Sequence, residues 1–440
     1  MMTSPLSTIL ATTMVVRAKV NDGYSLNTLL PQALDPLTGE DRSLAQAILY
    51  ESIRQTARNR FIIAKYATNK TAPLVRALLE CGLSAFQLDG LKEFTVVNET
   101  VDATKSHPEV RFASRFVNAI LRRYLREREA LEAAMARRDD CRYNAPTWWI
   151  NTMKKAQPTQ WQSILQLAQS HPPLTLRVNT RKSTVSEMSV RLTQAGIKAK
   201  QVGKDAIQLL EPMPVSQIPG FMDGFCSVQD AGAQLAAEFL PVKDGDRVLD
   251  ACAAPGGKTA HVLEKHEVAM TALEIDATRA QRIHENLDRL GLKANVVTAN
   301  AADTEQWWDK TPFDAILLDA PCTASGVVRR QPDTPWLRRA SDIAHLAQEQ
   351  KVLLEALWPL LKEGGHLLYV TCSIFPEEGR LQIRDFLKGH SDATLIPLCP
   401  GNQGMMVLLP QDGETYREGQ LPSVHDGFFY ALLKKEAHSN

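Results

Sequence analysis

Apolar residues recur at helical spacing through the first third of the chain. From about residue 4 to residue 138 they follow one another at three- and four-residue steps, most clearly over residues 44–53 and 112–125. This spacing places them on one face of a helix with a period of 3.6 residues. Most glycines and prolines of the region fall between such stretches. We therefore predict an all-α bundle of several short helices over residues 1–144.

The pattern changes after residues 144–147, whose proline interrupts the helical spacing. Short strand-like runs then alternate with helical stretches, so we predict a small α+β linker domain over residues 145–236. Its predicted elements are a helix over 148–168, a strand over 175–180, a helix over 185–194 and a strand over 206–210.

From residue 237 to residue 436, buried-looking apolar runs alternate with amphipathic helical stretches. Alternation at this spacing predicts βαβ units, and hence a parallel, doubly wound, Rossmann-like α/β sheet. A last apolar run over residues 427–433 predicts a closing strand. The other predicted strands are 247–251, 270–275, 295–298, 315–318 and 366–370, and the predicted helices are 258–265, 277–290 and 343–357.

The overall charge does not favour a partner of either sign. The 440 residues include 50 Lys and Arg and 50 Asp and Glu, so the formal net charge is zero. The arginines of the helical region therefore have two interpretations, a solvated helix face or a patch that contacts RNA. Residues 1–16 are mildly apolar but lack a basic start and a long apolar core, so we expect neither a signal peptide nor a membrane span.

Seven cysteines are scattered along the chain, and no two have CxxC spacing. The odd number and the lack of metal-ligand spacing argue against a disulfide framework and against a metal site. They favour a reducing, cytoplasmic location. We expect Cys81, Cys141, Cys226 and Cys399 to act as small buried hydrophobic residues.

A glycine-rich loop, DACAAPGGKT over residues 250–259, follows a predicted strand and opens a predicted helix. Glycines let a ligand approach the backbone, and a helix N-terminus offers unpaired N–H groups. No GxGxxG motif occurs, and Cys252 stands where a Walker loop needs its first glycine. A plain strand–loop–helix turn is the alternative interpretation of this segment.

The next predicted strand ends in Glu274, a carboxylate that can accept both hydroxyl groups of a ribose. Because the loop lacks a diphosphate-binding motif, the ligand that fits it is a nucleoside with a small charged tail, and we predict S-adenosylmethionine. Lys258 lies just inside the helix, where it can approach the methionine carboxylate; a solvent-facing lysine is the alternative.

Cys322 and Cys372 each directly follow a predicted central strand. Ligands of an open α/β sheet bind outside the carboxyl ends of its strands, so both thiols should reach the crevice of the glycine-rich loop. A thiolate that adds to carbon 6 of a pyrimidine makes carbon 5 able to accept a methyl group. An acid near N3, for which Asp319 is well placed, would stabilise the adduct, and a base would then remove the proton of carbon 5. The target must be unstacked or single-stranded to be reached.

These motifs resemble those of the RNA 5-methylcytosine methyltransferases of the Nol1/Nop2/Sun family. The resemblance implies that Cys372 is the nucleophile, that Cys322 assists release of the product and that Asp319 contacts the cytosine. It is carried by the loop 250–259, by Asp319-Ala320-Pro321-Cys322, by Thr371-Cys372-Ser373, and by shorter motifs at 228–230, 325–330 and 332–333.

The predicted cofactor pocket departs from this family at one position. The family usually has an aspartate near the adenine where this chain has Asn300, whose amide can still accept a hydrogen bond through its carbonyl oxygen. Asp303 is the alternative contact. The predicted cofactor-binding residues are Cys252, Ala253, Ala254, Pro255, Gly256, Gly257, Lys258, Glu274, Asn300 and Asp319.

The helical region resembles the RNA-binding bundle NusB, in residues 41–45 and 116–122. A NusB-like bundle joined to this catalytic domain implies a bacterial enzyme of 16S ribosomal RNA, with cytosine 967 as the target. The implied partner is small-subunit ribosomal RNA, bound through the helical domain and the small domain of residues 145–236. The resemblance further implies a monomer that binds neither DNA nor membranes. Arg329 and Arg330 would hold RNA phosphates or lie in a surface loop.

Two rival functions remain open at this point. One is a cytosine-C5 methyltransferase of tRNA, since the catalytic motifs do not name the RNA. The other is a non-catalytic NusB-like RNA-binding or antitermination protein, against which the intact Cys322 and Cys372 argue, because a binding module needs neither thiol.

Overall fold

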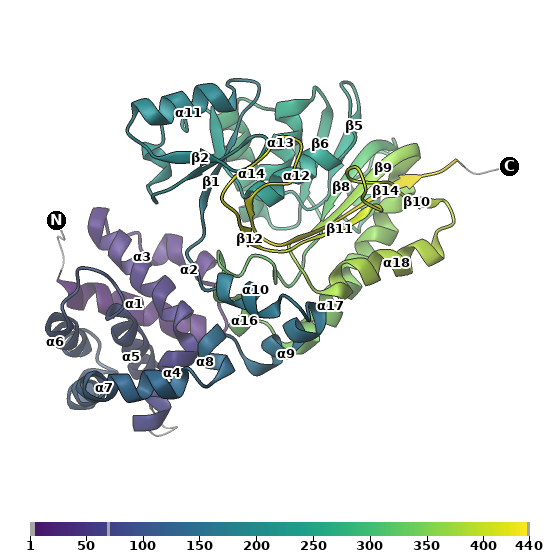
Figure 1. Cartoon of the computed structure of the whole chain (residues 1–440). Coiled ribbons are helices and arrows are strands. Elements are labelled where there is room, and N and C mark those ends of the chain that lie inside the picture. Colours follow the sequence, from purple (N-terminus) through teal and green to yellow (C-terminus); the bar gives the residue numbers. More distant parts are fainter. Residues whose placement is uncertain (1–4, 68–70, 438–440) are drawn as a thin grey trace. The chain divides into compact units, whose positions relative to one another are not determined.

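The computed structural model describes residues 5–67 and 71–437 and divides into two compact units (Figure 1). Unit 1 comprises the chain up to residue 170 together with Val328–Ala340, and unit 2 comprises His171–Val327 and the chain from Ser341 onward. The first residues of the predicted helical domain, 1–4, lie outside the described part. None of the helices within the described ranges is long and apolar enough to cross a membrane.

Unit 1 is all-α, as the helical spacing predicts. Its core gathers apolar side chains from the inward faces of the helices, including Ile9, Ile48, Leu78 and Leu121, each at most 3% exposed. Its helices are α1 (Leu6–Asn21), α2 (Leu26–Ala33), α3 (Gly39–Arg54), α4 (Thr56–Tyr66), α5 (Pro73–Ala85), α6 (Glu93–Ala103), α7 (Ser114–Met135), α8 (Asp139–Tyr143), α9 (Thr147–Ala156), α10 (Trp161–Leu167) and α16 (Thr334–Leu337), with 3₁₀ turns η1 (Thr104–Ser106) and η2 (Arg111–Ala113).

The single helix predicted over residues 148–168 is two helices in the structure. Helix α9 ends at Ala156, and Gln157 leaves the helical conformation with φ −133° and ψ 69°. Pro158 follows, and a proline disfavours helical geometry in the residue before it. The chain therefore turns before α10 begins at Trp161.

Unit 1 also receives the segment 328–340, which follows the Cys322 loop in sequence. Trp336 of this segment packs against the helical core, and the Arg60 guanidinium lies 4.8 Å from the centre of its ring. The Asp333 carboxylate accepts hydrogen bonds from the backbone N–H of Leu26, at 2.8 Å, and from the Ser25 hydroxyl, at 3.3 Å. Asp333 thereby satisfies N–H groups at the start of α2, as an N-terminal cap does.

The first part of unit 2 is a small antiparallel sheet with the strand order β2-β3-β1-β4. Its helix α11 (Val185–Gln194) coincides with the predicted helix and begins with a capping box between Thr184 and Glu187. The strands β2 and β4 have three residues each and escaped prediction, since so short a run carries little periodicity. The strands are β1 (Leu174–Val178), β2 (Ala199–Gln201), β3 (Ala206–Leu209) and β4 (Cys226–Val228).

The second part of unit 2 is a large sheet with the order β10-β14-β9-β8-β5-β6-β7, to which β11 adds by pairing with β14. The central strands β5 to β9 are parallel, as expected, but β14 runs antiparallel to β9 and β10. The sheet is therefore mixed, which corrects the prediction of a parallel sheet. An apolar run reveals a buried strand but not its direction, so the sequence pattern could not settle this point.

Successive residues of the central strands point to opposite faces of the sheet. Val248 contributes to the core beneath α12, α13 and α14, whereas its neighbour Leu249 contributes to the core beneath α17 and α18. The strands are β5 (Arg247–Asp250), β6 (Ala269–Glu274), β7 (Asn295–Thr298), β8 (Phe313–Asp319), β9 (Leu361–Thr371), β10 (Ala393–Leu395), β11 (Met405–Leu408), β12 (Gln411–Asp412), β13 (Val424–His425) and β14 (Phe428–Lys435). The helices are α12 (Ala231–Phe239), α13 (Gly257–Lys265), α14 (Ala277–Leu290), α15 (Thr304–Trp307), α17 (Ala340–Leu357) and α18 (Arg380–Gly389), with 3₁₀ turns η3 (Val215–Gln217), η4 (Trp358–Leu360) and η5 (Pro376–Glu378).

Candidate active site

The glycine-rich loop joins β5 to α13 at the carboxyl edge of the large sheet. Gly256 precedes the helix with φ +94°, a conformation that L residues rarely adopt, and a Cβ there would lie 3.2 Å from Ile283 of α14. Asp250 ends β5 beneath the loop and accepts a hydrogen bond from Thr259 Oγ1 at 2.6 Å. Burial raises the pKa of Asp250 to about 7, although this hydrogen bond opposes the shift. Its Oδ1 has no hydrogen-bond partner among the described residues, so a donor of a bound ligand can complete it.

The other predicted residues of the loop lie where the sequence places them. The backbone N–H of Ala253 bonds to the carbonyl of Leu273 at 2.8 Å, which fixes the loop to β6. Cys252 packs against the apolar cluster of the α17 face, and burial raises the pKa of its thiol. Cys252 therefore lines the loop as a neutral side chain.

Glu274 is the last residue of β6 and is 3% exposed, and Asn300 follows the neighbouring strand β7. The Glu274 carboxylate accepts from the Asp276 N–H at 3.1 Å. The next side chain, Ile275, is 66% exposed, so an apolar surface lies beside this carboxylate. Asn300 Oδ1 accepts from the N–H of Ala302 at 3.0 Å, so its amide NH₂ group is the part left for a ligand. Asp303 directly precedes the short α15, and its carboxylate accepts a hydrogen bond from the Gln306 amide rather than from the backbone of the helix.

A buried arginine of the small sheet holds the start of α13. The Arg177 guanidinium pairs with both carboxylate oxygens of Glu264, at 2.8 and 2.7 Å, and neither side chain is more than 1% exposed. Its Nη1 also donates to the carbonyl of Gly257 at 2.7 Å and to Gln229 Oε1 at 2.6 Å. Sequence analysis missed this residue, although a charged side chain within an apolar strand was a visible signal.

Strands β8 and β9 bring Cys322 and Cys372 together. The two strands are parallel, with Asp319 opposite Val370, so the residues that follow them emerge at the same edge. The two Sγ atoms lie 3.3 Å apart. The loop that carries Cys322 crosses the backbone so closely that a Cβ on Gly326 would lie 2.2 Å from the carbonyl oxygen of Gly427. Only glycine fits at that crossing.

The two thiols differ in their surroundings. Cys322 is 8% exposed, whereas Cys372 is half-buried. The hydrogen bond shared with Cys372, and then burial, raise the pKa of the Cys322 thiol. The Lys258 ammonium interacts electrostatically with Cys372. The raised pKa favours the protonated form of Cys322, which can therefore donate the hydrogen bond that the two sulfur atoms share.

Lys258 and Asp319 form an ion pair beside the thiols. Lys258 Nζ lies 2.6 Å from Asp319 Oδ2, and the side chains are 14% and 28% exposed. Burial disfavours the charge on Lys258, but the Asp319 carboxylate outweighs burial and raises the pKa of the ammonium. The sequence placed both residues in the site but did not reveal that they pair. An isolated lysine and an isolated aspartate at distant positions carry no signal of contact.

A buried carboxyl lies behind the two cysteines. Glu378 of η5 is 0% exposed and accepts hydrogen bonds from residues that directly follow Cys322 and Cys372 in sequence, namely Thr323 and Ser373. Burial raises the pKa of Glu378, against these hydrogen bonds. Sequence analysis missed this residue as well.

A second cluster of polar side chains lies farther along α13, away from the thiols. Asp205, Glu238 and His261 offer ligand atoms within 4.8 Å of one another. The Lys265 ammonium already pairs with both carboxylates, at 3.0 Å from Asp205 Oδ2, and Lys204 pairs with Glu238. The cluster is thus a network of ion pairs with the positive charge supplied by the chain itself.

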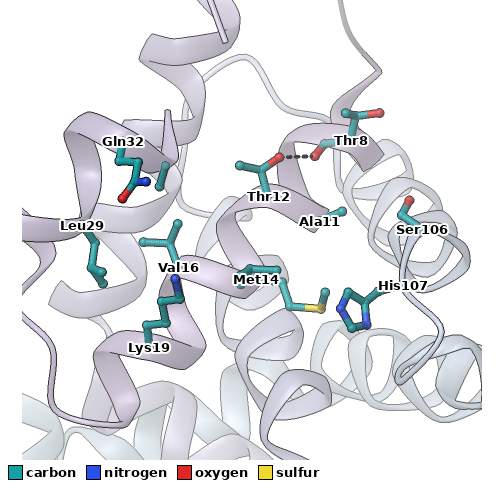
Figure 2. Close-up of a pocket in the computed structure, with 12 residues that line it drawn as sticks. Thr8, Ala11, Thr12, Met14, Val16, Lys19, Leu29, Gln32, Ser106 and His107 are labelled. Atoms are coloured by element: carbon teal, nitrogen blue, oxygen red, sulfur yellow. Dashed lines mark hydrogen bonds between the residues drawn. The ribbon is translucent and has the colours of Figure 1, made fainter. Parts of the chain in front are cut away.

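Two features of unit 1 lie outside this site. Arg329, a predicted phosphate contact, is only 2% exposed, so its side chain is buried rather than presented on a surface loop. A hollow of about 510 Å³ is bordered by α1 and α2. In Figure 2 the Met14 side chain points toward the His107 ring at its edge. None of the residues predicted for the site lines this hollow.

The fold and the loop define a class of protein. A central Rossmann-like sheet carries a glycine-rich loop after its first parallel strand, and an acidic residue ends the next strand. This combination is that of the S-adenosylmethionine-dependent methyltransferases. The crystal structure of PH0851 is 25% identical to this chain, with a TM-score of 0.78 over 97% of this chain and 99% of that one. A methyltransferase homologue from Pyrococcus horikoshii is 27% identical, with a TM-score of 0.55 over 67% of this chain and 97% of that one.

Comparisons of sequence identify the family. The family model of the 16S rRNA methyltransferase RsmB/F matches residues 237–434, its ferredoxin-like domain matches 145–216, and the NusB family matches 8–126. The ribosomal RNA small subunit methyltransferase B of Vibrio cholerae is 40% identical over 95% of this chain and 95% of its own length. That of Pasteurella multocida is 39% identical over 97% of each. The chain belongs to the RsmB/F family of S-adenosylmethionine-dependent 16S rRNA methyltransferases.

Proposed function

We propose that this protein methylates carbon 5 of a cytosine in small-subunit ribosomal RNA through a covalent bond between Cys372 and carbon 6. The observation that carries the proposal is the 3.3 Å approach of two sulfur atoms at the ends of adjacent strands, beside a lysine–aspartate pair. A thiol that attacks and a second group that removes a proton are the two functions that C5 methylation of a pyrimidine requires.

The first step is the attack of Cys372. A thiolate lone pair of Cys372 forms the S–C6 bond, and the C5=C6 electron pair moves toward N3, where it takes up a proton. Lys258 and Asp319, paired at 2.6 Å, are placed to supply that proton and to bind the N3 edge of the base. Bound S-adenosylmethionine supplies the electrophilic methyl group that carbon 5 then accepts.

The second step is the release by Cys322. The hydrogen bond to Cys372 is the largest cause of the raised pKa of Cys322, and it is lost once Cys372 is bonded to carbon. Cys322 then loses its own proton to solvent and, as a thiolate, takes the proton of carbon 5. The electrons of the broken C5–H bond restore the C5=C6 double bond, the S–C6 bond breaks to return Cys372 as a thiolate, and N3 returns its proton to the Lys258–Asp319 pair.

The cofactor is proposed to lie along residues 252–258, with Glu274 on its ribose. The glycine cradle, the unpaired Asp250 Oδ1 and the exposed Ile275 fit a nucleoside with a charged tail. Asn300 would face the adenine through its amide NH₂ group, which matches a ring nitrogen acceptor of adenine rather than its amino group. Asp303 stays the alternative.

Small-subunit ribosomal RNA is the proposed partner because the relatives named above act on it. A cytoplasmic location follows from that substrate. The exact target, for which the sequence suggested cytosine 967, and a monomeric state without affinity for DNA belong to the same proposal. A tRNA substrate is the alternative, and parallel assays with ribosomal RNA and tRNA distinguish the two.

The test uses RNA with fluorine in place of hydrogen at carbon 5 of cytosine. Fluorine cannot leave as a proton, so an enzyme that works through this route stays bonded to the RNA. The wild-type protein with S-adenosylmethionine should form a protein–RNA complex that survives denaturation, and Cys372→Ala should form none. Cys322→Ala should form the complex even on ordinary RNA, because it cannot complete release.

Cofactor binding by the two variants is the control. Both should bind S-adenosylmethionine as the wild type does, since neither sulfur belongs to the cofactor loop. A wild-type protein that methylates ribosomal RNA without forming a denaturation-resistant complex would refute the covalent route. Trapping by Cys372→Ala in place of Cys322→Ala would reverse the two assigned roles.

A further inference from the structure

Glu378 is a buried acid that bonds to both cysteine loops. Its Oε1 accepts from the backbone N–H of Thr323 at 2.8 Å and from Gln350 Nε2 at 3.2 Å. Its Oε2 accepts from the hydroxyl groups of Thr323 and Ser373. The four donors occupy the four lone-pair positions of an ionised carboxylate.

The backbone of Glu378, in the 3₁₀ turn η5, is also held by hydrogen bonds. The carbonyl of Glu378 accepts from the Tyr369 hydroxyl at 2.9 Å, and Tyr369 belongs to β9, the strand that precedes Cys372. Gln350 of α17 donates to the carbonyl of Pro321 at 2.8 Å, next to Cys322. Ser325 and Ser373 also share a hydrogen bond at 2.9 Å. The carboxyl group is therefore the centre of a network that spans both loops.

We propose that Glu378 is a positioning residue of the reaction: by bonding to Thr323 and Ser373, it holds the sulfur atoms of Cys322 and Cys372 facing each other. The inference rests on the proposed covalent route. Each anchored residue directly follows one of the two cysteines, so a displacement of either anchor moves the adjacent sulfur. Glu378 acts on the two sulfur atoms through these neighbours.

The charge of Glu378 has a second consequence. It contributes to the raised pKa of Cys322, after the hydrogen bond with Cys372 and burial. Cys322 thus retains its proton while Cys372 attacks. Removal of the charge should lower the pKa of Cys322 and so shift the pH dependence of product release, an effect that a purely structural side chain does not produce.

The test compares Glu378→Gln with Glu377→Gln. Glutamine keeps the volume of the side chain but replaces one acceptor oxygen by an NH₂ group. Because this group donates, it cannot accept the hydrogen bonds that the oxygen accepted. Glu377 precedes Glu378 on the same turn and is exposed, so it is a matched control. Glu378→Gln should slow single-turnover methyl transfer by about 100-fold, the usual effect of a misplaced reacting group. Glu377→Gln should leave the rate within about twofold of the wild type.

Three further measurements complete the test. Cofactor affinity of Glu378→Gln should equal that of the wild type, which shows that the fold and the loop 250–259 are intact. The pH at which adduct release reaches half its maximal rate should be lower than in the wild type. Thr323→Val, which removes one donor and keeps the shape, should lower the transfer rate in the same direction and serves if Glu378→Gln does not fold.

The outcomes separate the two proposals. A wild-type protein that forms no adduct with the fluorinated RNA refutes the covalent route itself. Adduct formation by the wild type, together with full transfer by Glu378→Gln, refutes only the role of Glu378. A slower Glu378→Gln whose release keeps the wild-type pH dependence assigns Glu378 a structural role and overturns the inference.

Discussion

The two halves of the active site are held by different chemistry. The cofactor half comprises the loop 251–256, helix α13 and Glu274, and buried ion pairs with the small sheet and α12 hold it, chiefly Arg177 with Glu264. The cysteine half comprises the loops after β8 and β9, and the neutral donors around Glu378 hold it. Lys258 connects the halves, because its backbone belongs to α13 and its ammonium group pairs with Asp319.

The difference indicates which property each half controls. A buried charge left without its partner is expensive, so a broken ion pair in the cofactor half should reduce stability and cofactor affinity together. The loss of one neutral donor to the Glu378 carboxylate costs less energy but shifts the sulfur atoms, so changes in the cysteine half should act on the rate. Substitutions in each half test this separation.

The largest effect is expected from Arg177→Met. The substitution leaves Glu264 buried and unpaired and removes the donor to the Gly257 carbonyl. The free energy of unfolding should fall by about 3 to 5 kcal/mol, measured by urea denaturation without cofactor. The dissociation constant of S-adenosylmethionine should rise in parallel, because the first residue of α13 loses its anchor.

Arg181→Met is the matched control in the same sheet-to-helix segment. Arg181 pairs with the exposed Glu267, and its own side chain is one-third exposed. Surface pairs contribute about 0 to 1 kcal/mol, so the loss should stay within that range. Equal losses from Arg177→Met and Arg181→Met would mean that the buried pair does not hold the cofactor half.

The next largest effect is expected from Lys258→Met, which tests the connection between the halves. If Lys258 serves Asp319 and the base, methyl transfer should fall about 100-fold while the dissociation constant of the cofactor stays constant. If Lys258 instead binds the methionine carboxylate, the dissociation constant should rise with little change in the rate at saturating cofactor. The 2.6 Å distance to Asp319 favours the first result.

Lys265→Met provides the comparison on the same helix. Lys265 pairs with Asp205 and Glu238 rather than with Asp319. Its loss should leave the transfer rate at saturating cofactor close to that of the wild type. A rate loss equal to that of Lys258→Met would show that any cation of α13 has the same influence, and the specific role of Lys258 would be wrong.

The parts of the molecule that depend on local pattern were predictable. Helix α14 and strand β7 coincide with the predicted ranges, because clear periodicity and flanking turns define them. The meeting of Cys322 and Cys372 was also predictable, since each follows a central strand and parallel strands end at one edge. The two cysteines are distant in sequence, but they become neighbours because the strands that precede them are neighbours in the sheet.

The parts of the molecule that depend on long-range contacts could not be predicted from the sequence. Glu377 and Glu378 are adjacent and identical in type, yet one is exposed and the other is 0% exposed at the centre of a network. No local pattern separates them, because the orientation of η5 decides which one points inward. Likewise Asp333 caps α2 from a position more than 300 residues away, a contact that no periodicity encodes.

The smallest effect concerns the pH dependence of stability in the cofactor half. His261 of α13 is 2% exposed, and burial lowers its pKa to about 3, although Asp205 opposes the shift. In the unfolded chain the His261 imidazole takes up a proton near pH 6.5, whereas in the folded chain it stays neutral at that pH. The contribution of His261 to the free energy of unfolding is thus fully present above pH 6.5 and is lost progressively as the pH falls toward 3.

His261→Gln should remove this dependence while keeping a polar side chain of similar length. At pH 5 the imidazole costs the wild type about 2 kcal/mol relative to pH 8, since each pH unit below 6.5 costs about 1.4 kcal/mol. Asp205 does not titrate in that interval, because the neighbouring His261 and Lys265 lower its pKa to about 2 despite burial. Urea denaturation at the two pH values should therefore show a smaller loss for His261→Gln than for the wild type. Equal losses would mean that the imidazole becomes protonated within the folded protein, and that Asp205 stabilises its charge more than burial disfavours it.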